Sequence, residues 1–93
     1  MIQSFADKDT ERLWNRERVR SIDSRIHSVA LRKLRQLGYA QMLDELRIPP
    51  GNRLEALKGD RRGQFSIRIN DQWRICFRWS AAGPEEVEIV DYH

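Results

Sequence analysis

The sequence contains little that could form cross-links, hold a metal ion or enter a membrane. It has one cysteine, Cys76, so neither an internal disulfide nor a CxxC metal motif is possible. Its two histidines lie far apart in the sequence, which argues against a structural zinc site. There is no apolar run long enough to cross a bilayer and no basic-then-apolar leader. These absences predict a cytoplasmic protein with no metal and no cofactor.

The chain is also too short for much enclosed volume. Its 93 residues fit a single domain, residues 1–93. A chain of this size buries only about 60–65% of the surface that its unfolded form exposes. We therefore expect one modest core and a shallow working surface rather than a deep active site.

Charge is unevenly distributed along the chain, whose net charge is +3. Residues 53–79 hold seven basic and three acidic residues, whereas residues 80–93 hold four acidic residues and no Lys or Arg. In the first stretch arginines interleave with aromatic residues, a combination typical of nucleic-acid-binding surfaces. A solvated strand face above a hydrophobic core explains the same pattern, and composition does not decide between the two.

The N-terminal half has the residue spacing of helices. Residues 2–5 are compatible with a short first strand, and Asp7 begins a helix that continues to Trp14. Asp23 is a favourable N-cap for a longer helix, and Gly38 is predicted to adopt the left-handed conformation just past its end. The apolar residues that recur at helical spacing in this second helix are Ile26, Val29, Ala30, Leu34 and Leu37.

The C-terminal half changes to the two-residue period of strands. Apolar and polar residues alternate over 65–69 and again over 73–79, and the NDQ segment between them has turn composition. A two-residue turn would put Ile67 opposite Arg74 and mix the two faces, whereas a three-residue turn pairs Ile67 with Ile75. We therefore predict the three-residue turn, followed by a second turn at AAGPEE and a last strand, VEIVDYH.

These periods predict an α+β fold in which two N-terminal helices pack on a small, twisted, mainly antiparallel sheet. The predicted register places Arg68 opposite Arg74 on the face that the helices leave open, with Arg78 farther along. Like charges directly opposed destabilise a sheet, so the pair must either extend into water or bind an anion. A phosphodiester backbone is an obvious candidate anion. Cys76 falls on the same face, and we interpret it as a packing residue rather than a nucleophile.

The chemistry available on this face is that of metal-free RNA cleavage. One group must remove the proton of the 2′-hydroxyl, another must stabilise charge on the phosphate, and a third must protonate the leaving 5′-oxygen. Lys58 and Arg74 can stabilise charge, and His93 can transfer protons near neutral pH. A non-catalytic RNA- or protein-binding module with a basic sheet face is the alternative, and spacing alone leaves both possibilities open.

Two stretches carry a resemblance to a known family: PPGNRLEALKGDRRGQFSIRINDQWRICFRW and VEIVDYH. They resemble the HigB toxins, which belong to the RelE-like superfamily of type II toxin–antitoxin systems and are also called plasmid-maintenance killer proteins. The N-terminal MIQSFADKDTERLW, the helix RIHSVALRKLRQL and the length suit that family too. The resemblance implies the RelE-like microbial RNase fold. It also implies a ribosome-dependent mRNA endonuclease, or mRNA interferase, that cuts in the ribosomal A site without a metal.

Residue roles follow from the same resemblance. Lys58 of LKGD and Arg74 of QWRI would hold the scissile phosphate and its transition state. In the terminal DYH, His93 would be the leading proton-transfer residue, Asp91 would orient or assist it, and Tyr92 would stack on or hydrogen-bond a nucleotide. Alternation puts Asp91 and His93 on one side of the strand and Tyr92 on the other, so either their roles differ or the strand twists. The residue that takes the first proton stays open.

The resemblance also implies the partners of the protein. These are a HigA-like antitoxin with a helix-turn-helix, the ribosome with its ribosomal RNA, mRNA, and operator DNA reached through the antitoxin complex. No membrane partner is expected. Further RNA-binding residues are expected among the arginines of the base-rich stretch, namely Arg53, Arg61, Arg62, Arg68 and Arg78.

Overall fold

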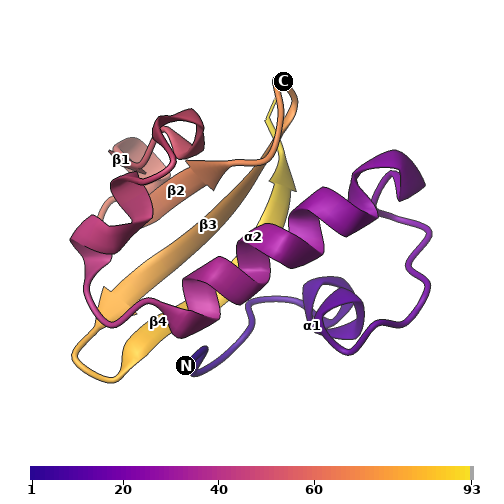
Figure 1. Ribbon diagram of the computed structural model, residues 1–93, viewed down its shortest axis with the longest axis horizontal. Helices are drawn as coiled ribbons and strands as arrows, with labels where there is room; N and C mark the ends of the chain where they lie inside the picture. Colours follow the sequence, from indigo (N-terminus) through magenta and orange to yellow (C-terminus); the bar gives the residue numbers. More distant parts are fainter. Residues whose placement is uncertain (93) are drawn as a thin grey trace.

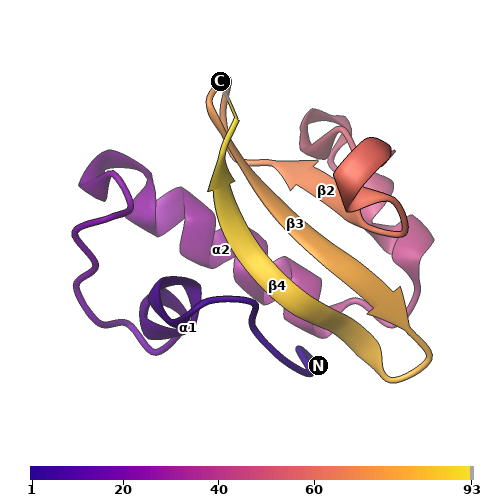
Figure 2. The ribbon, with the colours of Figure 1, turned by 180° about the vertical axis from the view of Figure 1, so that it is seen from behind.

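A computed structural model describes residues 1–92 as helices packed against one antiparallel sheet, and His93 lies outside the described residues. Helix α2 (His27–Tyr39) crosses one face of the sheet, and α1 (Lys8–Trp14) contacts both α2 and the last strand (Figure 1). Seen from behind, β3 and β4 lie in front of α2, so the helix covers only the far face (Figure 2). The predicted α+β fold is confirmed. The strands, in spatial as in chain order, are β1 (Glu55–Ala56), β2 (Phe65–Arg68), β3 (Trp73–Ser80) and β4 (Gly83–Asp91).

Short 3₁₀ helices make most of the remaining connections. They are η1 (Ser24–Ile26), η2 (Leu43–Arg47), η3 (Pro50–Asn52) and η4 (Gly59–Arg61). The first of these leads directly into α2, and η4 lies between β1 and β2. The other two, η2 and η3, fill the long connection from α2 to β1.

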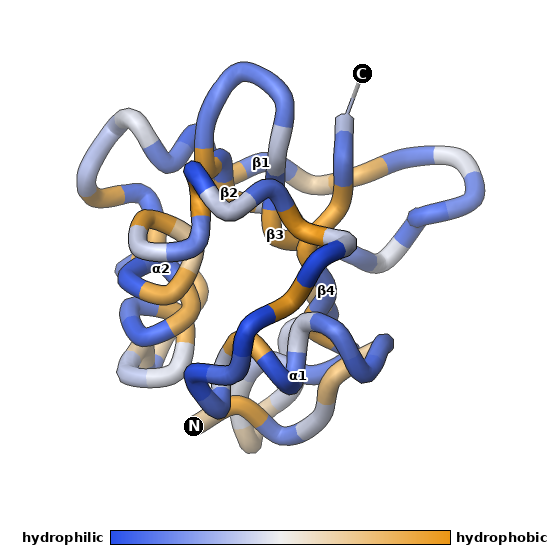
Figure 3. Tube along the Cα trace, turned by 90° about the vertical axis from the view of Figure 1, so that its right-hand side faces the viewer, coloured by the Kyte–Doolittle hydropathy of each residue, from blue (hydrophilic) through white to orange (hydrophobic). Residues whose placement is uncertain are grey.

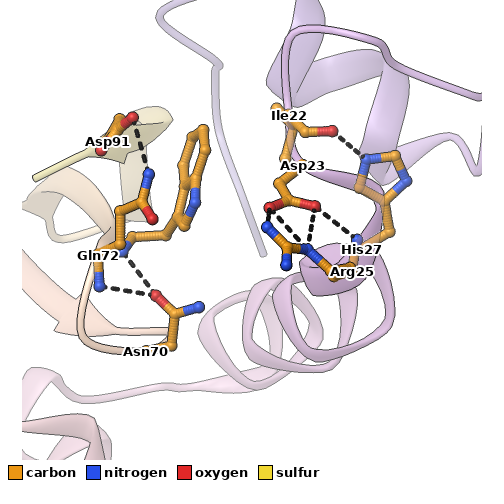
Figure 4. A network of polar contacts seen from close by, with 8 residues as sticks. Ile22, Asp23, Arg25, His27, Asn70, Gln72 and Asp91 are labelled. Carbon is orange, nitrogen blue, oxygen red and sulfur yellow. Dashed lines mark hydrogen bonds and ion pairs between the residues drawn. The ribbon is translucent and has the colours of Figure 1, made fainter.

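The aspartates predicted to start the two helical segments do cap them. Asp7 precedes α1, and its side chain accepts a hydrogen bond from a backbone N–H of the first turn. Asp23 caps η1 and also binds the Arg25 guanidinium, which lowers the pKa of the Asp23 carboxyl to about 2. Beside it, Nε2 of His27 lies 2.7 Å from the Ile22 carbonyl oxygen, so this histidine is used to close the start of α2 (Figure 4).

Two expectations for the N-terminal half were wrong. Gly38 lies inside α2 without a positive φ, because the helix continues past it. A Cβ there would lie 3.4 Å from Cη2 of Trp14, so the aromatic ring lies directly beside this position. Residues 2–5 form no full strand; a single parallel bridge joins Phe5 to Val87 of β4.

The β2–β3 hairpin has the predicted register. Ile67 lies opposite Ile75, and the Ile69 N–H donates to the Trp73 carbonyl at 2.9 Å across a three-residue turn. This register keeps the apolar side chains of both strands on the face toward α2. The fully buried side chains contributed by α2 and the sheet include Ala30, Leu34, Leu37, Ile67, Ile75, Phe77 and Val87.

Hydropathy along the chain agrees with this division into core and surface. In Figure 3 hydrophobic and hydrophilic stretches alternate along α2 and β4, and the peripheral loops are mostly hydrophilic. Such alternation is expected where one side of each element faces a shared core. The core therefore lies between α2 and the sheet, and the opposite face of the sheet is left for polar side chains.

The β3–β4 turn is tighter than the sequence suggested. The expected turn AAGPEE reduces to Ala81 and Ala82, because Ser80 pairs with Gly83. Gly83 has a φ of 129°, and a Cβ at this position would lie 2.5 Å from the carbonyl oxygen of Met1. Glycine is required there both by its backbone conformation and by the close approach of the N-terminus.

A β-bulge that alternation could not predict lies in β4. Cys76 pairs with Glu88 but Arg78 pairs with Glu85, so β4 carries one extra residue between these pairs. Glu86, within the bulge, has a φ of 51°. Uninterrupted alternation from Glu88 would aim Glu85 at the core, and the extra residue turns it outward instead. The bulge thus keeps a carboxylate out of the hydrophobic layer.

Thr10 joins α1 to β4 by one buried hydrogen bond. Its side chain is fully buried, and its Oγ1 accepts from the Ile89 N–H at 3.0 Å. We expect Thr10→Val to lower the free energy of unfolding by about 1–3 kcal/mol, because the Ile89 N–H would stay buried without an acceptor. Urea unfolding measures this. Thr10→Ser keeps the hydroxyl, so its free energy of unfolding should fall less than that of Thr10→Val. Equal decreases for the two variants would show that the hydrogen bond contributes little to stability.

Candidate functional site

Arg74 lies in β3 on the sheet face that α2 leaves uncovered. The exposed fraction of its side chain is only 12%. Its Nε donates to Ser66 Oγ at 2.9 Å, and its Nη2 donates to the Arg53 carbonyl at 2.9 Å and pairs with Glu55 Oε1 at 2.8 Å. These contacts come from β1, β2 and the segment before β1. A guanidinium held in this way is preorganised, as a group that stabilises anionic charge must be.

Tyr92 lies over Arg74 on the same face. The centroid of its ring is 5.9 Å from Cζ of Arg74, within the range of a cation–π contact. The Tyr92 N–H donates to the Gln72 carbonyl at 2.5 Å, which fixes the backbone just past β4. The residue is 42% exposed, so part of its ring remains available to a ligand. Among the predicted catalytic residues, the structure thus places the Tyr92 ring against the Arg74 guanidinium.

Asp91 lies on the other side of the sheet. It pairs with Trp73 of β3, and its Oδ2 accepts from Nε2 of Gln72 at 3.1 Å (Figure 4). Gln72 belongs to the β2–β3 turn. Asn70 closes this turn, because its Oδ1 accepts from the Gln72 and Trp73 N–H groups at 2.8 Å each. The expectation that Asp91 and Tyr92 face opposite sides is therefore confirmed. Asp91 binds the β2–β3 turn rather than Arg74, and the position expected for His93 falls outside the described residues.

Lys58 lies at the edge of the sheet, in the connection between β1 and η4. It is exposed and follows β1 by two residues, just before η4. Its carbonyl accepts from the Arg61 N–H at 3.2 Å, which turns the chain back toward β2. Lys58 therefore belongs to the same edge as Glu55, the carboxylate that contacts Arg74.

The arginines of this face are not the open row of cations that the sequence predicted. Arg68 and Arg74 lie opposite each other as predicted, but each has a carboxylate partner within the chain, a solution that was neither of the two expected, extension into water or binding of an anion. Arg53 and Arg62 are exposed, and within residues 1–92 neither forms an ion pair. The further ion pairs that involve predicted RNA-binding arginines are Arg61–Glu88 at 2.8 Å, Arg78–Glu86 at 2.6 Å and Arg68–Asp71.

The centre of the face is also less open than predicted. Ser66 and Cys76 lie opposite each other and are both fully buried. Burial raises the pKa of the Cys76 thiol, and the nearby Arg61 guanidinium only partly opposes this. A thiol that is inaccessible and protonated is a poor nucleophile, which agrees with its interpretation as a packing residue.

One hollow lies away from Arg74. It has a volume of about 800 Å³ and is bounded by the N-terminus, the end of α2 and the β3–β4 turn. Its described lining includes Met1, Trp14, Arg35 and Tyr39 but no aspartate, glutamate or histidine. Histidine and carboxylates are the commonest general acids and bases, so the region around Arg74 is the better candidate catalytic site.

The described residues contain neither a metal-binding cluster nor a membrane-spanning helix. Across residues 1–92, no group of three or more His, Cys, Asp or Glu side chains could hold a metal ion. No helix in that range is long and apolar enough to cross a membrane.

Two residues of the site were missed by sequence reasoning. Glu55 and Ser66 are opposed in the β1–β2 pair, and both bind the Arg74 side chain. Ser66 could have been found, because the predicted register puts it on the same face as Arg74. Glu55 could not have been found in this way. Its strand, β1, has only two residues, and η4 separates it from β2, so the sequence does not indicate which residues pair.

Comparison with known proteins identifies the family. Residues 3–93 match the family described as the RelE-like toxin of type II toxin–antitoxin system HigB. The chain belongs to the HigB-like toxins. Toxin HigB-1 of Vibrio cholerae is 45% identical over 80 residues, which cover 85% of this chain and 84% of that protein. Membership implies an antitoxin partner and, in general, a ribonuclease-type activity.

Two further proteins are similar to this chain at lower identity. An uncharacterized protein of Haemophilus influenzae is 34% identical over 58 residues, covering 62% of this chain and 57% of that protein. The solved structure of a YoeB/ParE toxin from Agrobacterium tumefaciens covers 99% of this chain and 96% of its own, with a TM-score of 0.54 and 23% identity. At that identity the likeness concerns the fold, which is RelE-like.

Proposed function

We propose that this HigB-like toxin is an endoribonuclease that cuts mRNA in the ribosomal A site and so inhibits translation. The reaction would proceed by attack of the 2′-hydroxyl on the neighbouring phosphate, without a metal ion. The observation that carries the proposal is the preorganised guanidinium of Arg74 with the Tyr92 ring over it, on the uncovered face of the sheet. Charge stabilisation of this kind is a large term in catalysis.

Each predicted catalytic residue has a proposed role, which for the described residues is supported by position. Arg74 and the exposed Lys58 would hold the scissile phosphate, and Tyr92 would stack on a nucleotide. Asp91, bonded to Gln72, would fix the β2–β3 turn and thereby the end of β4. His93 would protonate the leaving 5′-oxygen, a role that rests on its residue type and on the family resemblance.

Binding to the ribosome would involve the remaining arginines. Arg53 and Arg62 are exposed and are the first candidates for contacts with RNA phosphates. Arg61, Arg68 and Arg78 are proposed to contribute as well, although each would have to share its guanidinium with a carboxylate. An exposed Arg–carboxylate pair is weak, so a phosphate can compete for it.

The proposed partners are a HigA-like antitoxin with a helix-turn-helix and, through the antitoxin complex, operator DNA. Because the substrate is mRNA on ribosomes, the toxin would act in the cytoplasm as one domain. The alternative is a non-catalytic RNA- or protein-binding module, in which the basic groups bind but nothing is cut.

Induction in a host that lacks the antitoxin separates the two functions. The wild type should stop growth and create new mRNA ends on ribosomes, and His93→Ala should abolish both, because proton transfer typically contributes about 100- to 10,000-fold in rate. Lys58→Ala should weaken both. Co-sedimentation with ribosomes should persist in His93→Ala. Normal growth and unchanged mRNA ends with the wild type would exclude the nuclease.

A further inference from the structure

We infer that Asn70 is a positioning residue of the proposed reaction, because its side chain fixes the peptide group that holds Tyr92 over Arg74. The inference rests on the proposed function and concerns a residue of the β2–β3 turn that was not among the predicted site residues. It follows from the hydrogen bonds of Asn70, from the geometry of the peptide group that they orient, and from the position of Tyr92 past the end of β4.

The backbone of Tyr92 is anchored outside the pairing of β3 with β4. That pairing ends at Asp91, which lies opposite Trp73. Beyond this pair, the Tyr92 N–H donates to the Gln72 carbonyl at 2.5 Å, and the centroid of the ring lies 5.9 Å from Cζ of Arg74. Because a residue past the end of a strand lacks the regular pairing that aligns the strand, the Gln72 carbonyl determines where the Tyr92 ring lies.

Asn70 orients the peptide group to which that carbonyl belongs. The Gln72 carbonyl and the Trp73 N–H are the two sides of one planar trans peptide group, so they point in opposite directions. Oδ1 of Asn70 accepts from this Trp73 N–H and from the Gln72 N–H, at 2.8 Å each. Since the Trp73 N–H is fixed on Asn70, the Gln72 carbonyl points toward the Tyr92 N–H.

The Gln72 side chain strengthens the same arrangement. Its Nε2 donates to Oδ2 of Asp91 at 3.1 Å, so Gln72 holds two consecutive residues, Asp91 through its side chain and Tyr92 through its carbonyl. Figure 4 shows Asn70 and Asp91 on opposite sides of Gln72, each joined to it by a dashed line. The β2–β3 turn therefore holds the end of β4 in place.

This role of Asn70 can be separated from folding. Asn70 is exposed, so its replacement leaves the core unchanged. Main-chain bonds also close the turn, since the Ile69 and Asn70 N–H groups both donate to the Trp73 carbonyl, at 2.9 and 3.2 Å. The register of β2 and β3 is fixed in addition by the pairing of buried apolar residues. Loss of the Asn70 side chain should thus release the Tyr92 backbone without unfolding the hairpin.

NMR of the free protein tests the positioning directly. Tyr92→Ala should shift the signals of the Arg74 side chain, because it removes the aromatic ring beside the guanidinium. Asn70→Ala should shift the same signals in the same direction, whereas Asn70→Asp keeps the acceptor and should leave them near their wild-type values. Asn70→Ser has a weaker acceptor and should fall between, so it replaces Asn70→Ala if that variant does not fold. Unchanged Arg74 signals in the folded variant with the weakest acceptor would overturn the inference.

Single-turnover cleavage at saturating programmed ribosomes tests the consequence for the reaction. Asn70→Ala should lower the rate by about 10- to 100-fold, since a displacement of about 1 Å in a catalytic arrangement can cost about 100-fold, and Asn70→Asp should cleave close to the wild-type rate. In a Tyr92→Ala background the effect of Asn70→Ala should be clearly smaller, because both changes act on one ring. Equal fold-losses in the two backgrounds would overturn the inference.

Asn15→Ala is the matched control. Asn15 is also exposed and lies just past the end of α1, and within residues 1–92 its side chain forms no hydrogen bond. Its replacement should leave both the Arg74 signals and the cleavage rate unchanged. A wild type that cuts no mRNA, while Asn70→Ala still shifts the Arg74 signals, would overturn the proposed function and leave the positional role of Asn70 standing.

Discussion

Replacement of Arg74 by alanine is expected to lower the rate of ribosome-dependent mRNA cleavage by about 100- to 1,000-fold, the effect of removing one preorganised donor. Arg74 is the residue where the contacts of Glu55, Ser66, the Arg53 carbonyl and Tyr92 converge. Arg74→Lys keeps the charge but lacks the planar fork, so its rate should fall between those of the wild type and the alanine variant. Single-turnover cleavage on programmed ribosomes measures these rates.

Arg47→Ala is the matched control for this experiment. Arg47 is also ion-paired, with Asp44 at 3.0 Å, but both side chains are well exposed in η2. Its loss should leave cleavage unchanged. Thermal unfolding of the Arg74 variants should accompany the kinetics, because Glu55 and Ser66 lose a partner. A folded Arg74→Ala protein that cleaves at the wild-type rate would remove Arg74 from the mechanism.

Truncation of Phe77 is expected to have the largest effect on stability. Phe77 heads the set of large, fully buried side chains and lies in the centre of β3. Phe77→Ala should lower the free energy of unfolding by about 3–5 kcal/mol through lost burial and the cavity left behind. Domains of this size have a total stability of roughly 5–14 kcal/mol, so the variant should be marginally folded. Urea unfolding followed by circular dichroism measures the loss.

Phe65→Ala is the control for the Phe77 prediction. Phe65 lies opposite Phe77 with the ring centroids 6.3 Å apart, but it is only partly buried at the edge of the core. Phe65→Ala should therefore lower the free energy of unfolding by clearly less than Phe77→Ala does. Equal losses for the two variants would show that the contact between the rings, rather than the central position of Phe77, dominates the energy.

Local patterns predicted most of the fold because they act over short stretches of chain. The caps at Asp7 and Asp23 and the three-residue turn before Trp73 each depend on neighbouring residues. Failures occurred where a distant segment intervened. Gly38 lies inside α2 beside Trp14 of α1, and the bulge in β4 changes the side of the sheet to which Glu85 points. Neither feature is visible within a window of the sequence.

The candidate site was predicted in its components but not in its arrangement. The chain pattern and the family resemblance selected Lys58, Arg74 and Tyr92 before any geometry was known. They did not indicate that Glu55 would contact Arg74, because that contact depends on a two-residue strand. Nor did they indicate that carboxylates from other segments would neutralise the arginines, since side-chain pairing across a sheet depends on the final register.

The sequence by itself determined the fold class, the hairpin register and the membership of the chain among the HigB-like toxins. Periodicity and residue type are properties of the sequence, so they can be recognised before the structure is known. Only the tertiary structure decided which acid accompanies Arg74 and on which side of the sheet Asp91 and Tyr92 lie. Those outcomes depend on contacts between segments far apart in the chain, and such contacts exist only once the sheet has formed around a common core.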